Sequence, residues 1–131
     1  MIQDKNFQLR LIRQLAEMLQ KLIMDNPDEE LMKTNWNLDS RLKDIFNIDF
    51  ENLVKLSTED LVEKINEREK SQQVLCFELL AHLFFLVGKN GLNKAYLERS
   101  KYFYNLYLRE SSIFSFSIMK RLSEMETLLK D

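Results

Sequence analysis

The stretch that decides the fold is residues 74–96, VLCFELLAHLFFLVGKNGLNKAY. Its first fourteen residues are apolar except for Glu78 and His82, and its second half holds both glycines of the chain. A helix that is apolar nearly all round is packed on several sides. Fourteen residues are also fewer than the roughly 20 that span a bilayer. The stretch therefore predicts a central buried helix, a turn, and a second helix.

The composition of the whole chain points the same way. Its 131 residues are 45% hydrophobic and 31% charged, which is typical of one globular domain. Only two glycines and one proline are present, too few for the frequent tight turns of a β-rich fold. We therefore predict an all-α fold, a compact bundle of five to seven helices. Residues 1–131 form a single domain, with 1–66 as its N-terminal part and 67–131 as a C-terminal hairpin part.

Charge and cysteine content narrow the classes of partner and compartment. The net charge is -2, and neither half of the chain carries a strong basic patch, so we expect no nucleic-acid binding. No leader-like or membrane-spanning segment is expected either. The lone Cys76 excludes an intrachain disulfide and fits a reducing compartment, so we expect a cytoplasmic protein. A nucleic-acid stripe would need five cations that the helical period spreads apart: Lys89, Lys94, Arg99, Lys101 and Arg109.

Apolar periodicity and capping residues predict the helix boundaries. Helices are expected over residues 3–24, 27–46, about 50–54, 58–66, 70–87, 92–110 and 113–130. Asn26 with Pro27, and Ser57 with Asp60, give the start signals of two of them. Residues 66–73 are either a hinge or the exposed first turns of the central helix. Phe7 is expected on the buried face of the first helix.

Three blocks of the chain resemble a known family. They are MIQDKNFQLRLIRQLAEML (1–19), NIDFENLVKLSTEDLVEKI (47–65) and ELLAHLFFLVGKNGLNKAYLERSKYFYNLYL (78–108). Together they resemble a family of small, uncharacterised bacterial helical proteins, a domain of unknown function. The third block is also similar to a tetratricopeptide repeat, with Ala95 where the two helices would pack closely. The resemblance implies an antiparallel helix pair and carries over no catalytic residue.

The first candidate site is the pair of glycines, which could bind a phosphate group. A P-loop needs G-x-x-x-x-G-K-[ST] after a strand, whereas here Lys89 lies between glycines three apart after a helical segment. We expect instead that Gly88 ends the central helix in the left-handed conformation and that Gly91 loosens the turn. A weak anion site at the free amides near Leu92 is the alternative.

Glu78 and His82 are the second candidate site. They lie four residues apart on one helical face and could share a proton or a metal. Zinc needs three or four ligands, and the chain has one His and one Cys, so we predict no metal and no cofactor. A hydrogen-bonded structural pair is the favoured interpretation. The alternative is a small-ligand-binding protein or enzyme that uses a pocket near Glu78 and His82.

Aromatic residues near the C-terminus suggest contact with other proteins. Tyrosine is favoured at interfaces, and the predicted partner-binding residues are Tyr96, Tyr102, Tyr104 and Tyr107. The apolar seam of the last helix, Ile118, Leu122, Met125 and Leu129, either closes the domain or joins a second copy through the Ile113 to Leu129 helix. The function that we predict is a non-catalytic protein-protein interaction or scaffold module with an unidentified protein partner.

Overall fold

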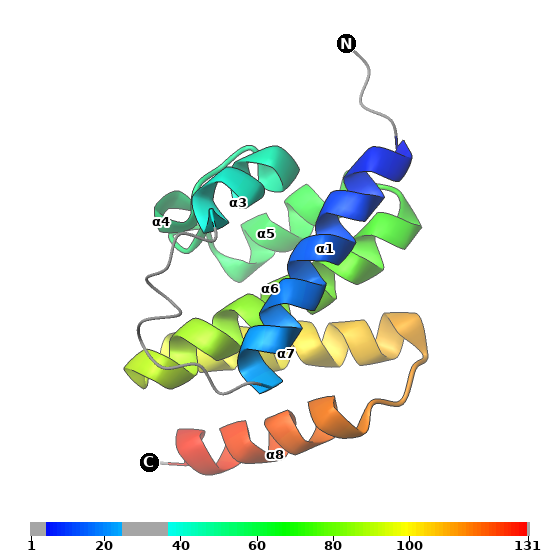
Figure 1. The fold of residues 1–131 in the computed structure, drawn as a ribbon. Coiled ribbons are helices and arrows are strands. Elements are labelled where there is room, and N and C mark those ends of the chain that lie inside the picture. The colour runs from blue at the N-terminus through cyan, green and yellow to red at the C-terminus, as the bar shows by residue number, and fades with distance from the viewer. Residues whose placement is uncertain (1–4, 25–36, 131) are drawn as a thin grey trace.

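The computed structural model describes residues 5–24 and 37–130, and these residues form helices with no strand among them (Figure 1). This confirms the predicted all-α class and the predicted number of five to seven helices. The helices are α1 (Lys5–Met24), α3 (Leu38–Phe46), α4 (Phe50–Leu53), α5 (Thr58–Asn66), α6 (Lys70–Gly91), α7 (Lys94–Ser111) and α8 (Phe116–Leu129).

The helices are arranged around α6. It packs most extensively against the antiparallel α7, then against α1, which crosses it, and against α5 (Figure 1). The helix α8 runs back along α7, while α3, α4 and α5 cover one end of the bundle. One hydrophobic cluster contains buried residues of all the described helices, so the two parts of the chain share a core.

The central position of α6 follows from its composition. Side chains on all sides of it are buried, including Phe77, Leu80, Phe84 and Phe85. By length and hydropathy, α6 is the one helix in the described part of the chain that could cross a membrane. However, 67% of its apolar stretch of 18 residues lies buried inside the fold. Core helices pass the same test of length and hydropathy, so this is weak evidence for a span.

The helix boundaries agree with the capping signals in the middle of the chain. The Ser57 hydroxyl accepts a hydrogen bond from the Asp60 amide at 3.0 Å and begins α5, as predicted. The short helix α4 is also confirmed, and residues 67–69 form the turn before α6, which begins at Lys70. Asn26, Pro27, Leu31 and Trp36 lie outside the described residues.

Three expectations near helix ends are wrong. A continuous helix over 27–46 is interrupted, because Asn37 adopts the left-handed conformation (φ 57°) directly before α3. Phe7 lies in the first turn of α1 and is exposed, because the side of this turn that faces α3 carries Gln8 instead, which donates to the Asp44 carbonyl. The last helix begins at Phe116 rather than Ile113, because the Ser115 hydroxyl caps it by accepting the Ile118 amide.

The turn between α6 and α7 also differs from the expected one. Both glycines are helical, and Leu92 takes the left-handed conformation (φ 50°) that was expected of Gly88. The Asn93 amide donates to the Gly88 carbonyl at 2.8 Å and the Leu92 amide donates to the Lys89 carbonyl at 3.3 Å. These two bonds are those of a Schellman motif, in which the left-handed position is commonly glycine.

Gly88 has a packing role instead of a turn role. A Cβ at Gly88 would lie 3.1 Å from the side chain and backbone nitrogen of Leu97, so glycine allows α7 to approach α6 closely. Ala95 was expected to do this, but it is exposed. The second close approach is at Ser100, whose hydroxyl donates to the Ala81 carbonyl at 2.7 Å.

Candidate functional site

A buried polar cluster joins three helices at the centre of the molecule. It consists of His82 of α6, Tyr104 of α7 and Arg121 of α8. The Tyr104 Oη lies 2.7 Å from Nδ1 of His82, and Nη1 of Arg121 donates to the same Oη at 3.1 Å. The second guanidinium nitrogen, Nη2, lies 3.4 Å from the sulfur of Met24 at the end of α1.

The directions of these bonds follow from the chemistry of the groups. A guanidinium can only donate, so the Tyr104 oxygen accepts from Arg121, and the same Nη1 also faces Nδ1 of His82 at 3.5 Å. A donor therefore faces Nδ1 and the Glu78 carboxylate faces Nε2 at 3.4 Å, which assigns the ring hydrogen of a neutral His82 to Nε2 and makes Tyr104 the donor to Nδ1. The cluster is therefore a directed chain from Arg121 through Tyr104 to His82, which we call the buried relay.

Glu78 lies beside Nε2 of His82, at the end of the buried relay. Its Oε2 lies 3.4 Å from Nε2 of His82, within ion-pair distance, yet Nε2 makes no hydrogen bond of normal geometry. At 3.4 Å the contact is long for a hydrogen bond, so it is mainly an attraction between the carboxylate charge and the polar Nε2–H group of the neutral ring. The predicted Glu78–His82 pair is thus adjacent in space, with His82 turned inward and Glu78 at the edge of the core.

Burial dominates the protonation of the cluster. The side chain of His82 is 1% exposed, and this burial lowers its pKa below the usual 6.5, although Glu78 opposes the shift. Burial likewise raises the pKa of Tyr104 well above its usual value, against the opposing effect of Arg121. His82 and Tyr104 are therefore neutral around pH 7.

Access to the cluster is poor, which limits its chemistry. A shallow hollow between α1 and α6 reaches Glu78, but His82 does not line it. No group of three or more His, Cys, Asp and Glu side chains within the described ranges could hold a metal ion. Burial raises the pKa of the Cys76 thiol to about 12, so this residue is an unreactive part of the core.

The four tyrosines predicted to bind a partner do not form one surface. Tyr104 is fully buried in the relay, and Tyr107 is buried on the same side of α7. Tyr96 is half-buried, where it packs against Phe84, and only Tyr102 is exposed, by 46%. The helical period explains this result, because positions 96, 104 and 107 of α7 share one side, whereas position 102 lies about 160° from 104.

The seam of the last helix faces its own domain. Ile118 and Met125 are buried, and Leu122 and Leu129 are half-buried against the core. The Arg121 side chain lies on this same seam, one turn after Ile118, which is why it enters the core. That spacing is the sequence signal from which the place of Arg121 in the relay could have been predicted.

Among residues 5–24 and 37–130, the largest group of exposed apolar side chains close together in sequence lies in the connection from α7 to α8. We call it the α7–α8 surface, and it consists of Ile113, Phe114, Phe116 and Met119. Phe114 and Phe116 are 76% and 71% exposed. Four large apolar side chains within seven residues are unusual on a monomer surface and commonly mark an interaction site.

The charged residues next to the α7–α8 surface in sequence are mostly positive. Arg109 and Lys120 are exposed next to it in sequence, and the first turn of α8 has no acidic residue to balance the positive helix end. The one carboxylate between these two cations in sequence, Glu110, is paired with Lys70 at 2.6 Å and with Arg109 at 3.3 Å. Hydrogen bonding to Lys70 lowers the pKa of Glu110 accordingly.

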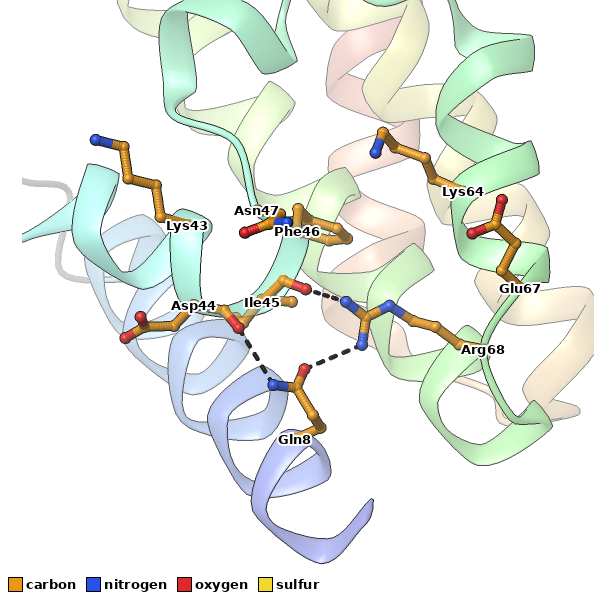
Figure 2. A pocket seen from close by; sticks show the side chains of 9 residues that line it. All are labelled: Gln8, Lys43, Asp44, Ile45, Phe46, Asn47, Lys64, Glu67 and Arg68. Atoms are coloured by element: carbon orange, nitrogen blue, oxygen red, sulfur yellow. Dashed lines mark hydrogen bonds between the residues drawn. The ribbon is translucent and has the colours of Figure 1, made fainter. Parts of the chain in front are cut away.

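A separate polar pocket of about 590 Å³ lies where α1, α3 and the α5–α6 turn meet (Figure 2). Arg68 reaches across it: Nη1 donates to Gln8 at 3.2 Å and Nη2 donates to the Ile45 carbonyl (Figure 2). Nη1 also donates to Gln72 at 3.0 Å. Its guanidinium also lies 5.4 Å from the centre of the Phe46 ring.

The role of Arg68 that follows from these contacts is structural. A cation at the carboxyl end of α3 stabilises that helix end, and the contacts tie together three helices that are distant in sequence. No local pattern predicted this, because residues 66–73 resemble any charged turn and the partners lie up to 60 positions away.

Comparisons of the chain with protein-family models, with curated proteins and with solved structures found no match. The resemblance to a family of uncharacterised helical proteins therefore stays a prediction.

Proposed function

We propose that this protein is a non-catalytic protein-binding module whose docking site is the α7–α8 surface. The observation that supports the proposal is the exposure of Phe114 and Phe116, at 76% and 71%, beside Ile113 and Met119. Exposing such side chains to water is unfavourable by about 1.5 kcal/mol or more for each one that could be buried. A partner that covers them recovers this free energy, and aromatic side chains are frequent anchors of interfaces.

The proposed occupant is an amphipathic segment of another protein that carries acidic residues beside its apolar face. Arg109 and Lys120 flank the surface in sequence, and Glu110, the one carboxylate between them in sequence, is paired with Lys70 and Arg109. Complementary charge speeds association and orients the partner. A helix is a suitable form for the partner segment. The apolar stripe of an amphipathic helix has residues three or four positions apart, and Phe116 and Met119 are likewise three positions apart on α8.

The alternative, a catalytic or ligand-binding role for Glu78 and His82, has less support. His82 is inside the core, and the hollow beside Glu78 does not reach it. A general base must come within hydrogen-bond distance of a substrate proton, and the buried relay already occupies the accepting nitrogen of His82.

Site-specific photo-crosslinking in the native cells tests the proposal. A benzophenone amino acid at position 114 or 116 is expected to give a discrete adduct, and one at the exposed Glu59 of α5 is the control. The contacted segment is then synthesised, and its affinity for the purified protein is expected to fall at least about tenfold in the double variant Phe114→Ser, Phe116→Ser. The same affinity should be unchanged in Glu59→Ser.

Two results would contradict the proposal. One is equal crosslinking at position 59 and at positions 114 and 116, or none at any of them. The other is an adduct of two copies of this chain, which would replace the hetero-partner with a homodimer. Because Phe114 and Phe116 are exposed, the double variant should retain the melting temperature of the wild type, so a loss of binding is not a loss of folding.

A further inference from the structure

We propose that the buried relay is a proton-sensitive latch that holds α8 on the α6–α7 pair and releases it when His82 becomes protonated. The latch is set by the direction of the hydrogen bonds and needs no partner protein. Arg121 is the residue of α8 that enters the relay, and it donates to Tyr104, which donates to Nδ1 of His82. Only an unprotonated Nδ1 can complete this chain.

Protonation affects the two sides of the imidazole differently. On the Nε2 side, Glu78 belongs to α6 itself and lies 3.4 Å away, so it attracts the charged ring without involving another helix. On the Nδ1 side, the new N–H faces the Tyr104 hydroxyl at 2.7 Å and the Arg121 guanidinium at 3.5 Å. Tyr104 can no longer donate there, and two positive charges face each other inside the core.

The weaker attachment of α8 makes it the element that yields. The helix α8 packs mainly on α7, whereas α6 is held by α1, α5 and α7 together. Only three residues of α8 are buried, and Arg121 is one of them. Repulsion at Arg121 therefore acts on a large part of the attachment of α8 and on a small part of the attachment of α6.

Other charged groups near the cluster do not reverse this difference. The charged and titratable groups of α6, α7 and α8 that face the cluster are Glu78, Tyr104, Tyr107 and Arg121. The charged groups of α1 lie around the hollow beside Glu78, and they are Arg13, Glu17 and Lys21. The α1 groups lie at the outer side of Glu78. Among the described residues, Arg121 makes no ion pair with a carboxylate that could take up its charge when His82 is protonated.

The direction of the pH dependence follows from linkage. The pKa of His82 in the folded protein is lowered from 6.5 by burial, so the unfolded chain binds a proton more readily. The contribution of neutral His82 to stability is therefore present above about pH 6.5 and is lost as the pH falls through that value toward the folded pKa. Release of α8 is expected within this acidic range.

Nuclear magnetic resonance of the full chain tests the latch, because His82 is the single histidine. Its ring signals report protonation directly, and amide exchange reports the opening of each helix, with rates corrected for the intrinsic effect of pH. As His82 titrates, the amides of α8 from Ile118 to Met125 are expected to exchange about tenfold faster or more. A tenfold change in exchange corresponds to a difference of one pKa unit for His82 between the closed and open states. Amides at the centre of α6 should keep their protection.

Two variants separate the latch from general acid unfolding. His82→Asn keeps an accepting oxygen near the place of Nδ1 and cannot titrate, so α8 should remain protected through this range. Arg121→Met removes the second charge and fits the apolar seam, so α8 should stay attached even after His82 is protonated. Loss of protection in α6 and α8 together, an α8 that stays protected after His82 titrates in the wild type, or α8 release in Arg121→Met at the wild-type midpoint would each overturn the proposal.

Discussion

The two connections made by α7 use the same backbone device with opposite results. At its N-terminal end the turn from α6 passes through Leu92 in the left-handed conformation, and at its C-terminal end the turn into α8 passes through Ser112 in that conformation. After the first turn, Leu97 packs onto Gly88 and the chain rejoins the core. After the second, Phe114 and Phe116 remain in water. Apolar residues are thus used for packing at one end of α7 and are exposed at the other.

The largest change in stability is expected when an aromatic ring that packs against α7 is removed and compared with the removal of a ring exposed after α7. Phe84 is fully buried and stacks on Phe103 at 6.3 Å between ring centres, so Phe84→Ala should lower the free energy of unfolding by about 3–5 kcal/mol. The matched change Phe114→Ala should alter it by less than about 0.5 kcal/mol. Urea denaturation measures both, and similar losses would mean that the α7–α8 surface is part of the core.

A smaller effect separates the two glycines of α6. Gly88→Ala places a methyl group 3.1 Å from Leu97, including its backbone nitrogen, and should be destabilising by about 1 kcal/mol after the gain in helix propensity. Gly91→Ala meets nothing within 4 Å and should be stabilising by about 0.5 kcal/mol. Thermal melting of the two variants gives the signs, and a stabilising Gly88→Ala would contradict the close approach of α6 and α7.

The smallest effect concerns the left-handed residues themselves. An L-residue in this conformation costs about 1 kcal/mol, so Leu92→Gly and Ser112→Gly should each be stabilising by about 0.5 kcal/mol once the greater freedom of unfolded glycine is included. Leu92 is exposed, so little packing is lost with its side chain. Denaturation curves for both variants check this, and a clear loss at either position would show that its side chain contributes to packing.

Local features of the sequence predicted those parts of the fold that depend on local interactions. The apolar residues around α6 indicated its burial, and the Ser57 cap indicated the start of α5. The same reasoning was wrong at Gly88, because the residue type alone does not tell whether a glycine lies inside a long helix or in a turn. The packing role of glycine at position 88 depends on Leu97, which lies on another helix.

The candidate site was predicted only in part. Glu78 and His82 were recognised as a pair because they are four residues apart on one helix, and the structure shows them adjacent. Tyr104 was predicted to bind a partner, but it lies in the buried relay, because the face of α7 that turns inward is set by α6 and α8. Arg121 and Arg68 were missed, since a cation in a sequence is expected to be in water unless its acceptors are known.

By itself, the sequence determined that this chain is all-helical, with α6 at its centre, because helical periodicity, capping and scarce turn residues act over a few neighbouring positions. Only the tertiary structure decided which polar groups would be buried together and which apolar ones would stay exposed. The buried relay joins residues that are 17 and 22 positions apart, and the exposure of Phe114 depends on where α8 begins. The physical reason is that burial and hydrogen bonding are properties of the packed helices together, so no single segment can specify them.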